Sequence, residues 1–326
     1  MSARFDKVAI LGAGTMGHAL ALVHTLGGCS VRLQDKDPEV LERAEELIAG
    51  AVRTLVRAGV CSERAAHEAT SRIVRTPDLE DAVADADLVV EAVFEDIEVK
   101  REVFTRVDEA APPDAIIASN TSYLDVFPLV PAGRARRTMI VHWYTPPYII
   151  DLVDVVPGPE TEPELILDMR DFLTGLGKRP IVLQKFIAGF IANRLQSALS
   201  LEIYALLDEG IATAEDIDAS IKHGLAARLA LLGQLMKADY AGLGLVRQSL
   251  ANRAYRPPEV RGHCRTVDEL VAAGRTGVMA GAGFYDYRGR TPAGLFEARD
   301  RKLLALKQAI GEIEREETVL EQPEGR

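Results

Sequence analysis

The first half of the chain alternates between short, uninterrupted apolar runs and longer segments in which apolar residues recur every three or four positions. Short apolar runs bounded by turn residues are typical of buried strands, whereas the wider spacing predicts amphipathic helices. The sequence therefore predicts strands at residues 8–11, 31–34, 72–76, 88–91, 116–119, 139–143, 152–156 and 180–183.

Helical spacing fills most of the intervals between these strands, at residues 17–26, 38–58, 62–70, 96–110 and 162–175. Alternating strands and helices build a mostly parallel, doubly wound sheet with helices on both faces. Beyond residue 186 only helical spacing remains, at residues 189–210, 214–223, 226–235, 240–253, 267–273 and 293–314. The sequence thus predicts an α/β domain over residues 1–186, an all-α domain over residues 187–314 and a polar tail over residues 315–326.

Composition narrows the classes of partner and compartment. A net charge of −11 at pH 7 argues against binding to nucleic acid or to an anionic membrane. No apolar run in the sequence is long enough for a signal peptide or a membrane span. Three cysteines without a CxxC pair favour a reducing, cytoplasmic location and no disulfide framework. None of them has metal-ligand spacing, so no metal is predicted.

A glycine-rich turn follows the first predicted strand and opens the first predicted helix. A GxGxxG pattern in that context is typical of a Rossmann-type dinucleotide site, because its glycines permit the tight turn, the approach of a pyrophosphate and close packing of helix on sheet. The helix start also offers free N–H groups and a partial positive charge to phosphates. The predicted cofactor-binding residues here are Gly12, Gly14, Thr15, Met16 and Gly17.

An acidic residue, Asp35, ends the second predicted strand. A carboxylate at this position binds the ribose hydroxyls of an adenosine and repels a 2′-phosphate. The sequence therefore predicts NAD rather than NADP as the cofactor.

Polar residues also follow the later strands. Glu95 comes shortly after the strand at 88–91, Ser122 comes after the strand at 116–119, and His142 lies inside the strand at 139–143. Open parallel sheets bind their ligands at the carboxyl ends of the strands. These side chains are therefore candidates for a common site.

These residues belong to motifs that resemble the 3-hydroxyacyl-CoA dehydrogenase superfamily, and the resemblance extends from Val8 to about Tyr287. The motifs, in chain order, are GAGTMG, VVEAVFED, SNTS, a strand with His142 followed by Pro-Pro, LVDVV, GFIANR, DEG and GFYDY. Such a resemblance implies an NAD-dependent oxidoreductase that transfers hydride between NAD and the C3 hydroxyl or keto group of an L-3-hydroxyacyl substrate.

The resemblance also implies roles for single residues. His142 matches the general base, a task suited to an imidazole, which titrates near neutral pH. Asp154 matches the carboxylate that pairs with this histidine and fixes its tautomer. Ser122 and Asn193 match the groups that bind and polarise the substrate oxygen.

Two further residues, Glu95 and Lys100, match cofactor-contacting positions of the superfamily, and Ser122 is a candidate cofactor contact as well as a substrate contact. Other readings stay open at this stage, because Lys100 is also compatible with a solvated helix lysine. Ser122 and Asn193 are compatible with simple capping of a turn and of a helix start.

Three departures from the superfamily pattern bear on the substrate. Asp154 replaces a glutamate and is one methylene shorter, so the pair with His142 must close up or be bridged by water. Thr145 stands where an asparagine is usual, and Met279 stands where a lysine is common. These departures leave the fold unaffected and question a fatty acyl-CoA as the substrate.

Residues 146–161 and 224–228 resemble the lambda-crystallin and L-gulonate 3-dehydrogenase branch, whose members act on free hydroxy acids. Arg228 lies in that last stretch, and a guanidinium can bind a free carboxylate through two hydrogen bonds. Two substrate classes therefore remain, a short 3-hydroxyacyl-CoA and a free 3-hydroxy acid. If the substrate is the acyl-CoA, Arg228 is simply a surface arginine.

The apolar stripes of the helical domain need burial, which predicts a homodimer. One alternative of another class remains: a non-catalytic, NAD-binding or structural protein that retains the fold. The intact glycine loop and His142 argue against that alternative.

Overall fold

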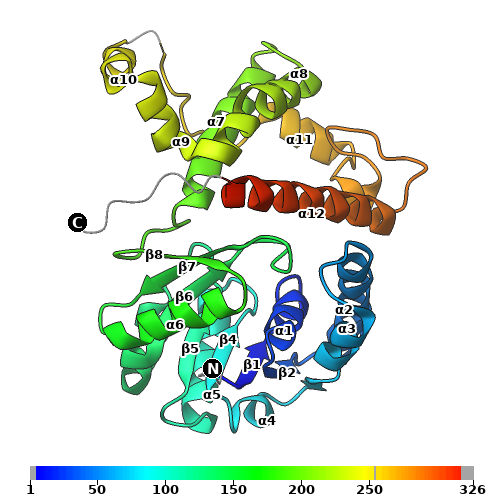
Figure 1. Ribbon diagram of the computed structural model, residues 1–326, viewed down its shortest axis with the longest axis vertical. Helices are drawn as coiled ribbons and strands as arrows, with labels where there is room; N and C mark the ends of the chain where they lie inside the picture. Colours follow the sequence, from blue (N-terminus) through cyan, green and yellow to red (C-terminus); the bar gives the residue numbers. More distant parts are fainter. Residues whose placement is uncertain (1–4, 253–254, 317–326) are drawn as a thin grey trace. The chain divides into compact units, whose positions relative to one another are not determined.

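A computed structural model describes residues 5–252 and 255–316 of the chain. The chain forms two compact units, Met1–Ile191 and Ala192–Arg326 (Figure 1). The first is an α/β unit and the second is helical, which confirms the predicted fold class.

One sheet of eight strands runs through the described part of the α/β unit, in the order β3-β2-β1-β4-β5-β6-β7-β8. Neighbouring strands are parallel except β6 and β7, which are antiparallel. The strands are β1 (Lys7–Leu11), β2 (Ser30–Gln34), β3 (Ile73–Thr76), β4 (Leu88–Glu91), β5 (Ile116–Ser119), β6 (Thr138–Trp143), β7 (Leu152–Pro157) and β8 (Arg179–Val182).

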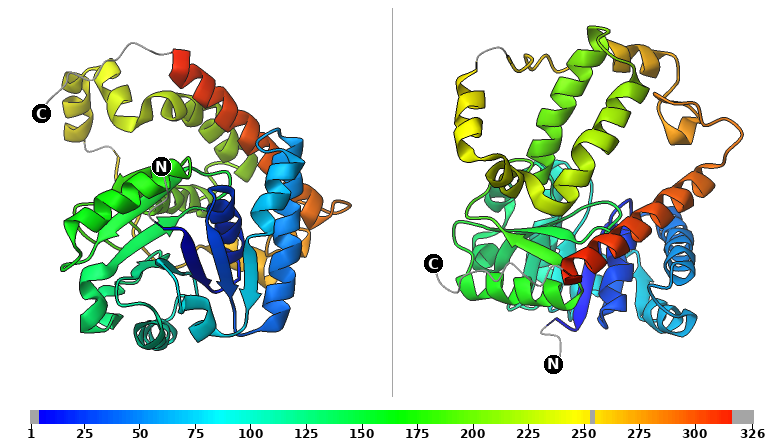
Figure 2. Two further views of the ribbon diagram at one scale, coloured as in Figure 1. Left: turned by 60° about the horizontal axis from the view of Figure 1, so that its bottom comes forward. Right: turned by 45° about the horizontal axis from the view of Figure 1, so that its top comes forward.

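Helices cover both faces of this sheet (Figures 1 and 2). Alternate strand residues point to opposite faces, and one set packs in a core that includes residues of α4 and α5. On the other face α1 and α6 meet, where the His24 and Phe172 rings lie 5.9 Å apart. The helices are α1 (Gly17–Leu26), α2 (Pro38–Arg57), α3 (Glu63–Thr70), α4 (Leu79–Val83), α5 (Ile97–Ala110) and α6 (Pro163–Gly175), with short 3₁₀ turns η1 (Phe127–Leu129) and η2 (Ala132–Arg137).

The predicted strands of this unit match the observed ones to within a residue or so at each end. A short helix, α4, precedes β4 in a stretch where no separate helix is predicted above. The side chain of Asp78 accepts a hydrogen bond from the Asp81 N–H at 3.0 Å and so caps α4.

The helical unit consists of α7 (Ala192–Asp208), α8 (Ala214–Ala219), the π-helical η3 (Ser220–Ala226), α9 (Ala227–Ala241), α10 (Leu243–Ala251), α11 (Arg265–Ala272), the 3₁₀ turn η4 (Val278–Ala280) and α12 (Pro292–Glu316). The helix expected over 189–210 begins only at Ala192, because Gly189 and Phe190 have φ values of 78° and 49°. The two helices expected over 214–235 are continuous through η3.

Most of the predicted polar tail, residues 317–326, lies outside the described residues, and the first part of it belongs to α12. Among the described residues, no helix is both long and apolar enough to cross a membrane.

Candidate active site

The glycine loop between β1 and α1 has two crowded glycines and one open glycine. A Cβ at Gly12 would lie 2.6 Å from the carbonyl oxygen of Ala92, and a Cβ at Gly17 would lie 1.7 Å from that of Gly12. A Cβ at Gly14 would meet no protein atom within 4 Å among the described residues. The backbone at Gly14 is therefore open to a ligand, as a loop that cradles a pyrophosphate requires.

Two contacts fix this loop against its neighbours. Asp35, at the end of β2, accepts a hydrogen bond from the Ala13 N–H at 2.9 Å through Oδ2. The hydroxyl of Thr145, just beyond β6, lies 3.1 Å from Sδ of Met16 and donates to it. Because of these contacts, the predicted cofactor loop, the acid after β2 and the segment after β6 lie together.

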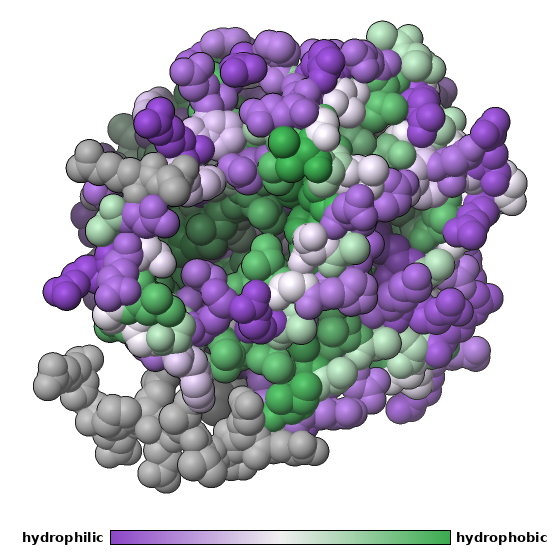
Figure 3. All heavy atoms as spheres, turned by 90° about the horizontal axis from the view of Figure 1, so that it is seen from above, coloured by the Kyte–Doolittle hydropathy of each residue, from purple (hydrophilic) through white to green (hydrophobic). Residues whose placement is uncertain are grey.

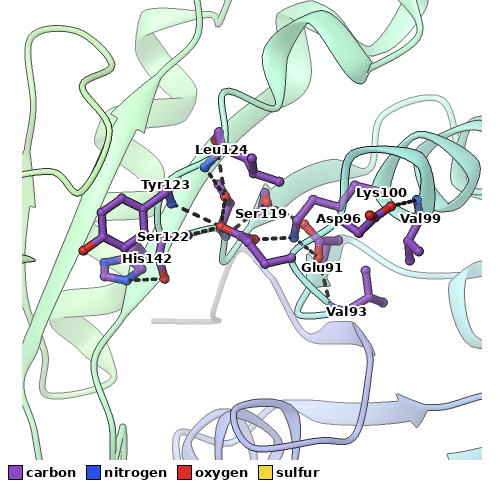
Figure 4. A network of polar contacts seen from close by, with 12 residues as sticks. Glu91, Val93, Asp96, Val99, Lys100, Ser119, Ser122, Tyr123, Leu124 and His142 are labelled. Atoms are coloured by element: carbon purple, nitrogen blue, oxygen red, sulfur yellow. Dashed lines mark hydrogen bonds and ion pairs between the residues drawn. The ribbon is translucent and has the colours of Figure 1, made fainter. Parts of the chain in front are cut away.

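A buried ion pair stands beside the loop, at the carboxyl ends of β4 and β5 (Figure 4). Glu91, which is fully buried, accepts from Lys100 Nζ at 2.7 Å and from the Ser119 hydroxyl at 2.5 Å. Only 1% of the Lys100 side chain is exposed. The reading of Lys100 as a solvated lysine is therefore wrong, and the buried charges are paired and hydrogen-bonded as burial requires.

Glu95 links this ion pair to the loop that carries Ser122. One of its oxygens lies 3.1 Å from Lys100 Nζ, and the other accepts from the Thr121 hydroxyl at 2.7 Å and from the N–H groups of Ser122 and Tyr123 at 2.9 and 3.1 Å. Burial would raise the pKa of Glu95, but these hydrogen bonds and the Lys100 charge hold it below its ordinary value. Glu95 thus anchors the Ser122 loop as an anion.

His142 and Asp154 face each other across the antiparallel pair β6 and β7, in direct register. His142 Nδ1 lies 3.3 Å from Asp154 Oδ2, and both side chains are buried. A carboxylate can only accept, so Nδ1 carries the proton and Nε2 accepts from the Ser122 hydroxyl 3.2 Å away. We refer to His142 and Asp154 as the dyad, and the structure brings Ser122 to it.

Two aromatic residues that the sequence did not single out complete the surroundings of the dyad. The hydroxyl of Tyr144 donates to Asp154 Oδ2 at 2.7 Å, and its ring centre lies 4.6 Å from that of His142. The Phe190 ring lies 5.0 Å from the imidazole. The alternation of β6 was the available signal for Tyr144, because residues two apart face the same side of a sheet.

Asn193 and Arg228 lie in the helical unit. Asn193 is the second residue of α7, where its backbone carbonyl accepts from the Ser197 hydroxyl at 2.7 Å. Arg228, on α9, is exposed, and its Nε donates to the Gly224 carbonyl at 2.9 Å. Met279 is 76% exposed in η4. No group of side chains suited to a metal ion occurs among the described residues.

A glycine loop at a helix start, an acid after the second strand and a histidine at the carboxyl edge of the sheet define a dinucleotide-dependent oxidoreductase. Residues 7–186 match the NAD binding domain of 3-hydroxyacyl-CoA dehydrogenase, and residues 189–287 match the C-terminal domain of the same enzyme. The chain belongs to the 3-hydroxyacyl-CoA dehydrogenase family and is an NAD-dependent oxidoreductase, as its motifs indicated.

Several relatives span most of the chain. It is 31% identical to 5-formyl-3-hydroxy-2-methylpyridine 4-carboxylate 5-dehydrogenase of Mesorhizobium japonicum, over 93% of this chain and 98% of the relative. It is 35% identical to 3-hydroxybutyryl-CoA dehydrogenase of Bradyrhizobium diazoefficiens (90% and 99%), and 34% identical to the lambda-crystallin homolog of Homo sapiens (70% and 72%).

A solved structure of an enzyme with the first of these names, described as an NAD⁺-dependent dismutase, superposes with a TM-score of 0.83 at 30% identity. That superposition covers 94% of this chain and 98% of the other. The relatives therefore include both acyl-CoA enzymes and an enzyme of a free carboxylate.

We expect Gly14→Ala and Gly17→Ala to separate cofactor binding from folding. A methyl group at Gly14 meets only open space, so this variant should keep its melting temperature and lose at least tenfold in NAD affinity, measured by calorimetry. Gly17→Ala is the matched control and should lower the melting temperature, because its methyl group clashes with backbone. Unchanged NAD affinity in Gly14→Ala would contradict the assignment of this loop.

Proposed function

We propose that this protein oxidises the C3 hydroxyl group of an L-3-hydroxyacyl substrate, with His142 as the general base. The observation that carries the proposal is the chain of contacts Ser122–His142–Asp154 at the carboxyl edge of the sheet, beside the glycine loop. In this arrangement the protonated Nδ1 faces the Asp154 carboxylate, and the basic Nε2 faces the Ser122 hydroxyl. A substrate hydroxyl would bind beside Nε2.

In the proposed reaction, Nε2 of His142 takes the proton of the substrate hydroxyl while the C3–H bond breaks and the carbonyl forms. The glycine loop and Asp35 would hold NAD, which would supply the acceptor for the hydride of C3. Asp154 stabilises the imidazolium that results, and the Ser122 hydroxyl donates to the substrate oxygen. Asn193 is the proposed second donor to that oxygen.

We assign cofactor binding to the α/β unit. The proposed contacts are the loop Gly12–Gly17, Asp35 for the ribose hydroxyls, and Glu95, whose side chain is 36% exposed. Lys100 acts in this scheme by holding the charge of Glu95, because its own ammonium group is buried between two carboxylates.

Of the two substrate classes, the free hydroxy acid is the better supported. The relative that spans 93% of this chain is named for a pyridine carboxylate, which is a free acid. Arg228 supplies a guanidinium on α9 with N–H groups beyond the Nε that bonds to Gly224, and these can bind a carboxylate. A short 3-hydroxyacyl-CoA is the second candidate, because the chain is also 35% identical to a 3-hydroxybutyryl-CoA dehydrogenase.

The helical unit is the proposed dimer surface. Large apolar side chains of α7, α9 and α10 are exposed, and no residue of these helices is buried. Apolar surface of this extent marks an interface, and a second copy offers a self-complementary one. Figure 3 shows apolar side chains among polar ones on one face of the protein. The exposed apolar side chains of α7, α9 and α10 include Leu195, Leu199, Leu235, Met236, Tyr240, Leu243, Leu245 and Leu250.

The assay of His142 uses NAD reduction, followed by absorbance, with L-3-hydroxyacyl-CoAs and free L-3-hydroxy acids side by side. We expect turnover by the wild type and a loss of about 10²- to 10⁴-fold in kcat for His142→Gln, because a general base contributes that much. His67→Gln, which changes an exposed histidine of α3, is the control and should keep full activity. Full activity in His142→Gln would overturn the mechanism, and inactivity of the wild type despite NAD binding would favour the non-catalytic alternative.

Arg228→Ala tests the substrate class. Loss of a charge-assisted contact to a free carboxylate should raise KM for free acids by about tenfold or more, with little effect on thioesters. Arg247→Ala, at another exposed arginine of the helical unit, is the matched control. Equal effects on acids and thioesters would remove the support that Arg228 gives to the free-acid class.

Light scattering at micromolar concentration should give twice the mass of one chain. Leu235→Glu together with Leu250→Glu places two charges in the proposed interface and should yield monomers. A wild-type protein that is monomeric at this concentration would contradict the homodimer.

A further inference from the structure

Asp154 is a buried carboxylate with few donors. None of its surface is exposed, and Oδ1 has no hydrogen-bond partner among the described residues. Both of its hydrogen-bond contacts reach Oδ2, from the Tyr144 hydroxyl at 2.7 Å and from His142 Nδ1 at 3.3 Å. The shorter and better bond is the one from the tyrosine, so the tyrosine does most to fix the carboxylate.

The position of Tyr144 follows from the strand pattern. It comes directly after β6, two residues beyond His142, and therefore lies on the same face of the sheet as the imidazole. Trp143, between them, points to the opposite face, where its ring lies 5.6 Å from His24. The hydroxyl of Tyr144 thus reaches the carboxylate from the side of the dyad.

We propose that Tyr144 is a positioning residue, which fixes the buried carboxylate of Asp154 through Oδ2 and sets the pH at which the dyad gives up its proton. The proposal deepens the role assigned to His142 and rests on it.

The sign of the pH effect follows from charge. A donor to a carboxylate stabilises its anionic form, so it lowers the affinity of the whole dyad for a proton, wherever that proton resides. Without the Tyr144 hydroxyl the dyad should keep its proton to a higher pH. The basic form that the reaction needs would then be populated only at more alkaline pH.

Other charged groups surround the dyad, and all of them remain present in a Tyr144 variant. Glu95 and Lys100, from the end of β4 and from α5, approach through the Ser122 loop. On the opposite face of β6, His24 of α1 and Lys178 lie against the Trp143 ring. A shift seen in a Tyr144 variant can therefore be assigned to the lost hydroxyl.

The first test needs no substrate. The six histidines of the chain are labelled with ¹⁵N and titrated by NMR, with His142→Gln used to assign the signal of the dyad. In Tyr144→Phe, which keeps the ring, we expect the midpoint of that signal to rise by about one pH unit. Tyr148→Phe, which removes a hydroxyl from the same connection between β6 and β7, is the control and should leave the midpoint unchanged. An unmoved midpoint in Tyr144→Phe overturns the proposal, whatever the substrate.

The second test uses turnover of the substrate found above. In Tyr144→Phe the acid limb of the kcat/KM profile should move up by the same amount, so that kcat/KM falls about tenfold below the midpoint and recovers at high pH, while KM for NAD is unchanged. A uniform loss at all pH values would indicate a merely structural role and contradict the proposal. A moved NMR midpoint without turnover of any hydroxy substrate would instead refute the proposed function and leave Tyr144 as a positioning residue.

Discussion

The burial of the Asp154 carboxylate is the constraint on which this site depends. A charge without access to water is tolerated only where donors are held against it. In this chain the donors come from one strand end, His142 and Tyr144, and the antiparallel course of β7 brings the carboxylate to them. The reversal of direction between β6 and β7, in an otherwise mostly parallel sheet, therefore serves the chemistry directly.

A second buried carboxylate organises the other side of the site by the same rule. Glu91 and Ser119 are partners in register on β4 and β5, and Lys100 reaches them from α5. Glu95 continues this arrangement to the Ser122 loop. The register of β6 with β7 thus positions the His142 imidazole, and the register of β4 with β5 positions the Ser122 loop. The imidazole and the Ser122 hydroxyl meet at the carboxyl edge of the sheet.

The sequence predicted those parts of the fold that depend on local pattern. Apolar runs gave the strands, and the glycine spacing gave the turn at Gly12 and Gly17, where backbone crowding demands glycine. It could not give the burial of Lys100, because a lysine in a first helical turn is solvated unless a distant strand supplies carboxylates. Tyr144 was missed for the same reason, since its partner lies ten residues away on another strand. The late start of α7 depends on the left-handed backbone of Phe190, a conformation that favours glycine and has no apolar signature.

The connection between β6 and β7, residues 144–151, lies outside the strand ladder that aligns the dyad. The dyad depends on the ladder register, in which a slip of one residue would turn Asp154 to the wrong face. The backbone pairing of β6 with β7 ends at Trp143 and Val153, so the connection forms no pair of that ladder. Within it, Tyr144 contacts the dyad and Thr145 contacts the cofactor loop, while Lys178 fastens the connection through the carbonyls of Pro147 and Ile150. A scaffold of this kind can acquire a new loop beside its reactive centre and keep the reaction.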